Sequence, residues 1–315
     1  MNFNVEQRTI LLVRHGSHAY GTSVPTSDLD VKGVCIEPLE YHLGFLHKFE
    51  QHESMGSKHD DIDKVIYSLK KFANLAADCN PNIIEVLHVS DSDVLALDEF
   101  GEELRANRNA FISKKAKHTF SGYAHAQLKR IKTHRSWILS PPSAPPTRKA
   151  FGLSEERKIS QSELGAFDAS IEKGHQVTLP KEMLTVYTRE KAFQTAKLQY
   201  DQYVNWLKSR NPARAELEAR YHYDTKHGMH LLRLMRMCKE ILATGQVIVK
   251  RPDADELLRV RNGFLSYEEL VGQAETLEKE CDVLYQTSTL PHQPDRNKLD
   301  QLIVSMTQRY LTKHG

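Results

Sequence analysis

The stretch from His15 to Gly33 reads HGSHAYGTSVPTSDLDVKG, and the rest of the chain is interpreted outward from it. An apolar run, Thr9-Ile10-Leu11-Leu12-Val13, leads directly into it. A turn of small residues begins at Gly16-Ser17, and two aspartates at alternating positions follow, Asp28 and Asp30. Glycine lets backbone N–H groups approach an anion closely, and alternate residues of a strand point to the same side. The stretch therefore predicts an anion-binding turn that leads into a metal-binding strand.

The composition is typical of a folded, helix-rich, soluble protein. A chain of 315 residues is long enough for two domains, because single cores tend to stop growing near ~250 residues. Apolar residues make up 40% and charged residues 27%, with 15 glycines and 12 prolines. The formal net charge is +2, which does not by itself indicate a nucleic-acid-binding protein. Any basic surface must therefore be local.

The cysteines and the N-terminus indicate a reduced, cytoplasmic setting. The four cysteines contain no C-x-x-C pair, which argues against a zinc ribbon and a secreted disulfide framework. The N-terminus lacks the basic-then-apolar pattern of a signal peptide, and no apolar run approaches the ~20 residues of a membrane span. We therefore expect no membrane insertion. The cysteines are Cys35, Cys79, Cys238 and Cys281.

The first hundred residues mix strands and helices. Residues 9–13 fit either the end of a helix or a buried strand, whereas 29–36 alternates as a strand should. Residues 51–59 are polar and predict a loop, and 65–69 predicts a second strand. Helical spacing follows until Asn80-Pro81, where the proline ends one helix and can begin the next.

From about residue 98 the pattern becomes helical. A proline-rich connector at 140–147 predicts extended backbone, and the polar, weakly periodic residues 152–180 predict a mobile insertion. Gly245 ends the strongest helix, as a left-handed glycine often does. The expected helices are 100–120, 123–138, 190–208, a segment from 213, 225–244, 268–285 and 299–311.

The paired aspartates carry the chemistry. Two carboxylates on alternate residues of a strand, joined by a third from a neighbouring strand, can hold two divalent metals within ~4 Å of each other. Mg²⁺ prefers oxygen ligands and keeps several waters, so carboxylates and substrate phosphates suit it. Asp-x-Asp by itself more often marks a solvated turn. The glycine turn at Gly16-Ser17, at this distance after an apolar segment, is what favours a site for two Mg²⁺ or Mn²⁺ ions.

These motifs resemble the signature of DNA polymerase beta superfamily nucleotidyltransferases. The resemblance is closer to the bacterial and phage branch called the RNA repair pathway DNA polymerase beta family. It rests first on Gly16-Ser17, Tyr20-Gly21-Thr22 and Ser27-Asp28-Leu29-Asp30, with Gly33 following. The branch's later landmarks are similar to 63–72, Asn80-Pro81-Asn82 with Glu85, 226–234, 240–245 and 261–263.

The resemblance implies an α+β fold and assigns the carboxylates. A polymerase-beta-like nucleotidyltransferase core, a short mixed sheet with helices, would span 1–112. A larger, all-helical domain would span 113–315, with the connector and the insertion within 140–185. Asp28, Asp30 and Asp63 would be the metal ligands and catalytic residues, and Asp63 would accept or position the acceptor hydroxyl. Asp61 is the alternative third carboxylate, because a register slip of two keeps the same face.

Two further groups of residues are predicted to bind the nucleotide. On a helix from Thr225, Lys226, His230 and Arg233 share one face, and this cationic stripe would close over the phosphates and sugar. A solvated basic face is the alternative, and Tyr20 would fit a core equally well. The glycine-turn group consists of Gly16, Ser17, Tyr20, Gly21, Thr22 and Ser27.

A basic stretch points to the acceptor. Lys129, Arg130, Lys132 and Arg135 are interleaved with aromatic residues, a pattern that suits an RNA end, although basic helices with ordinary core aromatics are commoner. The predicted reaction is attack of a hydroxyl on the α-phosphate of an NTP with release of pyrophosphate. The favoured acceptor is an RNA terminus, with tRNA as one candidate. The alternatives are a protein hydroxyl, or a catalytically silent module that binds nucleotide or RNA.

Overall fold

The computed structural model describes residues 3–54, 62–156, 159–172 and 181–314. The chain divides into two compact units. The first combines Met1–Lys132 with Asp224–Gly315, and the second is Thr133–Tyr223. The second unit is therefore inserted in the sequence of the first. The domain boundary predicted after residue 112 stays a prediction.

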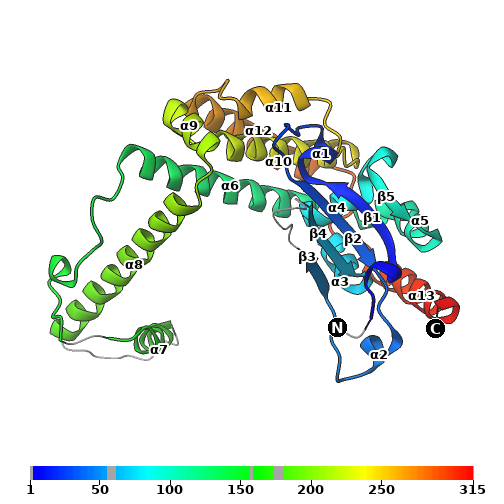
Figure 1. Cartoon of the computed structure of the whole chain (residues 1–315), viewed down its shortest axis with the longest axis horizontal. Coiled ribbons are helices and arrows are strands. Elements are labelled where there is room, and N and C mark those ends of the chain that lie inside the picture. Colours follow the sequence, from blue (N-terminus) through cyan, green and yellow to red (C-terminus); the bar gives the residue numbers. More distant parts are fainter. Residues whose placement is uncertain (1–2, 55–61, 157–158, 173–180, 315) are drawn as a thin grey trace. The chain divides into compact units, whose positions relative to one another are not determined.

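The first unit contains a five-stranded mixed sheet (Figure 1). The strand order is β3-β4-β2-β1-β5, with β2 and β4 parallel and the other neighbours antiparallel. Residues 9–13, which fit a helix end or a strand, form a strand with Ile10, Leu11 and Val13 fully buried. The strands are β1 (Thr9–His15), β2 (Leu29–Cys35), β3 (Gln51–Ser54), β4 (Ile62–Ser68) and β5 (Val94–Leu97).

Helices cover the sheet and form the rest of the described chain. The predicted α+β class, a mixed sheet with helices followed by a larger helical region, is confirmed. The helices are α1 (Gly16–Tyr20), α2 (Leu39–Leu43), α3 (Leu69–Ala77), α4 (Pro81–His88), α5 (Glu99–Ala106), α6 (Lys115–Leu139), α7 (Gln161–Glu172), α8 (Lys181–Ser209), α9 (Pro212–Tyr221), α10 (Thr225–Thr244), α11 (Ala254–Arg261), α12 (Tyr267–Thr287) and α13 (Arg296–His314).

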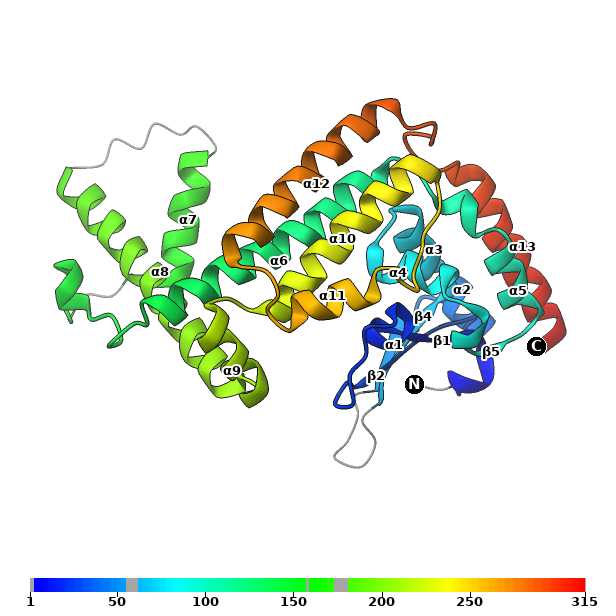
Figure 2. The ribbon, with the colours of Figure 1, turned by 90° about the horizontal axis from the view of Figure 1, so that it is seen from above.

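The ends of α10 and α12 show why these helices form where they do. The Asp224 side chain accepts a hydrogen bond from the backbone of the first turn of α10, and Gly245 ends that helix at φ 72°. The predicted bounds 225–244 are therefore confirmed. Ser266 and Glu269 form a reciprocal capping box at the start of α12. Figure 2 shows α10 lying alongside α11 and α12.

Helices α3 and α4 position the sheet for the candidate site. Their apolar faces are buried, with Phe72 and Ala76 on α3 and Ile84 and Leu87 on α4 at 0% exposure. Helix α3 contacts β2 and β4, and α4 contacts β1. The strand ends that carry the aspartates are therefore supported by a packed core.

Some local predictions differ from the structure. Residues 51–54, predicted as part of a loop, form β3, whose polar side chains are tolerated because β3 is an edge strand. The turn predicted at Gly16-Ser17 is the first turn of the short helix α1. The polar segment 152–180 contains helix α7. Residues 140–147 contain no helix or strand, as the prolines predict.

The second unit is helical and has its own aromatic cluster. Trp137 lies against Tyr203 and Trp206, with ring centroids 5.7 and 5.4 Å away. A buried ion pair fastens residues 148–151 to α8, because both terminal nitrogens of Arg148 lie 2.7 Å from the carboxylate of Glu190.

Across the described residues, no helix combines the length and the apolar character that crossing a membrane requires. The four cysteines are free and buried.

Candidate active site

The register of β2 brings two of the predicted carboxylates together. Asp30 pairs with Asp63 on the parallel strand β4 and with His15 on the antiparallel strand β1. Neighbouring strands lie ~4.8 Å apart and residues in register point to the same face. Asp28 lies just before β2, two residues from Asp30. Asp28 and Asp63 are exposed and Asp30 is half-buried. Asp61, the alternative third carboxylate, lies outside the described residues.

The glycine turn lies directly against Asp30. Gly16 adopts φ +64°, and a Cβ added there would be 2.1 Å from Asp30 Oδ2. The segment then closes on itself, since the Thr22 backbone N–H donates to the Ser17 carbonyl at 2.9 Å. Gly21 ends α1 at φ +75°. Glycine is therefore required at position 16 both by the backbone conformation and by the carboxylate beside it.

We expect Gly16→Ala to reduce activity far more than Gly21→Ala. Both substitutions force a side chain into the left-handed region, at about 1–2 kcal/mol. Only the first places its Cβ on Asp30, whereas at Gly21 the nearest atom is Ala254 Cβ at 3.6 Å. Displacing a reacting group by about 1 Å can cost 10²-fold in rate. Urea unfolding and nucleotide-transfer rates of both variants check this, and equal rate losses would contradict it.

A buried glutamate behind this turn was not among the predicted site residues. Glu85 on α4 is fully buried and receives 2.5 and 2.6 Å hydrogen bonds from Tyr20 Oη and Arg233 Nη1. The Arg233 guanidinium also lies 3.8 Å from the centroid of the Tyr20 ring. His15 Nε2 is 3.2 Å from Glu85 Oε2. A charged residue within the apolar run Ile83-Ile84-Glu85-Val86-Leu87 is the sequence signal that could have pointed to it.

The charges in this cluster are fixed by burial and by mutual pairing. Burial alone would raise the pKa of Glu85, but the Arg233 charge, the nearby His15 ring and the hydrogen bond from Tyr20 hold that pKa below its usual value. Burial, followed by the charge of Lys32, lowers the pKa of His15. Glu85 is therefore an anion and His15 a neutral ring at neutral pH.

Lys32 extends the cluster along β2. It lies two residues after Asp30, so it belongs to the same face of the strand. Its Nζ donates to the Asn82 carbonyl at 3.0 Å. Burial lowers the pKa of Lys32 to about 8, against the opposing effect of the Glu85 and Asp30 charges. A cation thus lies near Asp30, on the same face of β2.

One residue of the predicted cationic stripe on α10, Arg233, forms a contact inside the protein. Arg233 is buried against Glu85, so its side chain is directed into the cluster. His230 and Lys226 are half-buried. Burial, then the charges of Arg233 and Lys226, lowers the pKa of His230 to about 3. The structure therefore brings the three residues together with His230 neutral, while their roles stay predictions.

Helix α11 adds a residue that the predicted site did not include. Arg261 Nη1 lies 3.4 Å from the Thr22 carbonyl oxygen, and its charge also acts on His230. The Arg251 backbone N–H donates to the Tyr20 carbonyl at 3.0 Å. The glycine turn is thus held by α11 and by the loop that precedes it. The landmark 261–263 was the sequence signal for Arg261.

The remaining predicted residues have the following surroundings. Tyr20 is in the core, and Thr22 is fully buried with its hydroxyl unpartnered among the described residues. Ser17 is half-buried, and Ser27 Oγ accepts from the Val24 backbone N–H at 2.9 Å. Gly33 packs closely on β1, since a Cβ there would be 2.9 Å from the Leu11 carbonyl oxygen.

The basic residues predicted to bind RNA lie on α6. Lys129, Arg130 and Lys132 are exposed and belong to the first unit. Arg135 belongs to the second unit and donates to the His222 carbonyl at 3.1 Å. The first three therefore form an accessible basic surface, which we call the α6 basic surface.

Comparison with known proteins agrees with this arrangement. Residues 2–139 match the sequence model of the RNA repair pathway DNA polymerase beta family. A protein of Enterobacteria phage T4, described as the uncharacterized 38.9 kDa protein in the nrdC-mobD intergenic region, is 26% identical over 280 residues. The alignment covers 81% of this chain and 83% of the phage protein. No solved structure matches the chain.

The matched segment contains the glycine turn, the three predicted carboxylates and Glu85. Its family indicates a polymerase-beta-like nucleotidyltransferase that depends on divalent metal. The resemblance of the motifs is thereby confirmed, since residues 2–139 match the model of the RNA repair pathway DNA polymerase beta family.

Proposed function

We propose that this chain transfers a nucleoside monophosphate from an NTP to the hydroxyl of an RNA end and releases pyrophosphate. The observation that carries the proposal is the register of Asp30 with Asp63, beside the left-handed turn at Gly16. Asp28 adds a third carboxylate two residues before Asp30. An anion-accepting turn next to clustered carboxylates suits a metal-bound triphosphate.

The donor set fits divalent metal ions. Asp28, Asp30 and Asp63 offer hard carboxylate oxygens, which Mg²⁺ and Mn²⁺ prefer. The missing Cβ at Gly16 lets Asp30 Oδ2 lie directly against the backbone of the turn. Two ions held by these residues would activate the attacking hydroxyl and neutralise charge on the leaving phosphates.

The chain's own residues position the reactants. Backbone N–H groups of the Gly16-Ser17 turn face the phosphates, and Asp63 accepts or positions the acceptor hydroxyl. Lys226 and Arg261 supply positive charge near the turn, and the neutral His230 serves as a hydrogen-bonding group. Arg233 supports the turn from behind through Glu85 and Tyr20. Catalysis would then rest mainly on positioning and charge stabilisation.

The choice of RNA as acceptor rests on the family description and on the α6 basic surface. The deciding experiment incubates the protein with Mg²⁺, each labelled NTP in turn, total RNA and total protein. We expect the label in RNA. Label in polypeptide would establish protein nucleotidylation instead, and label in neither would favour the catalytically silent binding module.

The α6 basic surface makes a separate prediction about RNA affinity. Reversing both charges in Lys129→Glu with Arg130→Glu should weaken binding of a single-stranded RNA end and reduce its salt dependence. The slope of log affinity against log salt should fall by about 1.4, since each lost phosphate contact contributes ~0.7. Fluorescence anisotropy across a salt series measures this. The matched control, Lys298→Glu with Lys313→Glu on α13, should keep the parent slope, and an equal change in both variants would contradict the assignment.

A further inference from the structure

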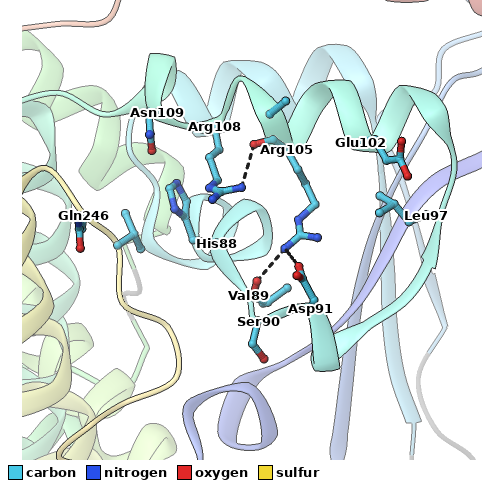
Figure 3. A pocket seen from close by; sticks show the side chains of 12 residues that line it. His88, Val89, Ser90, Asp91, Leu97, Glu102, Arg105, Arg108, Asn109 and Gln246 are labelled. Carbon is cyan, nitrogen blue, oxygen red and sulfur yellow. Dashed lines mark hydrogen bonds and ion pairs between the residues drawn. The ribbon is translucent and has the colours of Figure 1, made fainter.

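A polar cavity lies in the first unit, and no predicted site residue lines it. Its volume is about 720 Å³, and it is bounded by the end of α4, by α5 and by the loop that contains Gln246 (Figure 3). Ligand pockets commonly have volumes of about 300–1,000 Å³. The cavity is therefore large enough for a nucleotide-sized molecule.

One end of this cavity is basic. Figure 3 shows the His88 ring beside the Arg108 guanidinium, with Asn109 next to them. Arg105 Nη2 donates to the Val89 carbonyl at 2.9 Å and lies 3.1 Å from Asp91. Arg108 Nη1 donates to the Arg105 carbonyl at 3.3 Å, which is a long hydrogen bond. It uses one of the five N–H donors of the guanidinium group. No ion pair between Arg108 and a carboxylate occurs among the described residues.

Two buried polar atoms at this end lack partners. Arg105 Nε and His88 Nε2 are both buried without a hydrogen bond in the described part of the chain. Buried polar atoms are rarely left unpaired in native proteins, so such atoms call for a partner from outside the chain. An anionic acceptor would take hydrogen bonds from the guanidinium groups and from the N–H of the neutral imidazole.

The electrostatics favour an anion at the same place. Burial, then the charges of Arg108 and Arg105, lowers the pKa of His88 to about 3. Two carboxylates also border the cavity. Asp91 is highly exposed and pairs with Arg105, and Glu102 lies beside Leu97, away from His88 and Arg108 (Figure 3). Positive charge at the His88 end is therefore only partly compensated.

We propose that His88, Arg105 and Arg108 bind a phosphate group, carried by a free anion, a nucleotide or an RNA strand. Guanidinium groups bind phosphate with directional, charge-assisted hydrogen bonds, and the remaining volume accommodates the nucleoside. None of Asp28, Asp30 and Asp63 lines this site. It can therefore be tested separately from the proposed transfer reaction.

The test uses the full-length protein with ¹⁵N-labelled histidine and no divalent metal. Inorganic phosphate is titrated while the His88 ring signals, assigned with His88→Gln, are followed by NMR. We expect a saturable shift of these signals. Arg108→Gln should weaken the binding roughly tenfold or more, because a hydrogen bond to a charged group is lost.

The control is Arg296→Gln, which removes an exposed arginine that pairs with Asp78 and does not line the cavity. It should leave the titration unchanged. Further titrations use 5′-AMP and a short oligoribonucleotide. Of these two and inorganic phosphate, the probe that binds with the highest affinity identifies the source of the phosphate. If none of the three probes moves the His88 signals, or if Arg108→Gln and Arg296→Gln behave alike, the proposal is wrong.

Discussion

Substituting asparagine for both Asp28 and Asp30 should abolish nucleotide transfer. Asp28 lies just before β2, and Asp30 lies at its N-terminal end in register with Asp63. The double substitution therefore removes two of the three predicted metal ligands. Stabilisation of developing charge by bound metal is worth several kcal/mol, and each 1.36 kcal/mol is tenfold in rate. We therefore expect a loss of about 10³-fold or more, measured by incorporation of labelled NTP.

The double substitution should leave the fold intact, since Asp28 is exposed and asparagine matches aspartate in shape. Far-UV circular dichroism and urea unfolding check this. Mn²⁺ binding, followed by water proton relaxation, should weaken in parallel with activity. The matched control, Asp201→Asn with Asp300→Asn, changes two exposed aspartates outside the site and should retain parent activity. A doubly substituted protein that transfers nucleotide as well as the parent would overturn the enzymatic proposal.

Replacing Glu85 with glutamine should destabilise the protein by about 3–5 kcal/mol, because it leaves the buried Arg233 charge without its partner. Arg233→Met should cost a similar amount by leaving Glu85 unpaired. The variant with both substitutions should recover part of the loss, since no uncompensated charge then remains in the core. Urea unfolding of the four proteins gives the coupling free energy.

An exposed ion pair provides the contrast. Lys313 and Glu99 lie 2.8 Å apart, but both side chains are more than half exposed. Glu99→Gln should therefore change stability little, because solvent already screens such pairs. If the losses in the free energy of unfolding caused by the Glu85 and Arg233 substitutions were additive, the proposed coupling between these two residues would be wrong. Unchanged nucleotide affinity and turnover in Arg233→Met, with the fold intact, would show that Arg233 acts on neither the turn nor the phosphates.

Strong local patterns predicted much of the fold. The helix at 225–244 has an apolar stripe, a capping aspartate and a terminal glycine, so its bounds follow from adjacent residues. The strands β3 and β5 were missed because each has only four residues, too few to show alternation. Strand β3 is also polar, which an edge strand tolerates. Helix α11 was missed because its eight residues allow barely two turns of periodicity.

The candidate site was predictable where its residues are close in sequence. Asp28 and Asp30 could be predicted from their alternate positions in the sequence. The choice between Asp61 and Asp63 depends on strand register, which the sequence does not determine. The structure pairs Asp30 with Asp63. Glu85 and Arg233 are separated by 148 positions, so no local pattern links them.

That separation has a consequence for the order in which the protein can mature on the ribosome. All five strands precede residue 98, whereas Arg233 follows only after the inserted unit Thr133–Tyr223 has been made. At about 5–20 residues per second, the 148 positions from Glu85 to Arg233 take roughly 7–30 s to synthesise. During that interval the nascent helix α4 carries a carboxylate whose arginine partner does not yet exist, so the glycine turn gains this support only when α10 emerges.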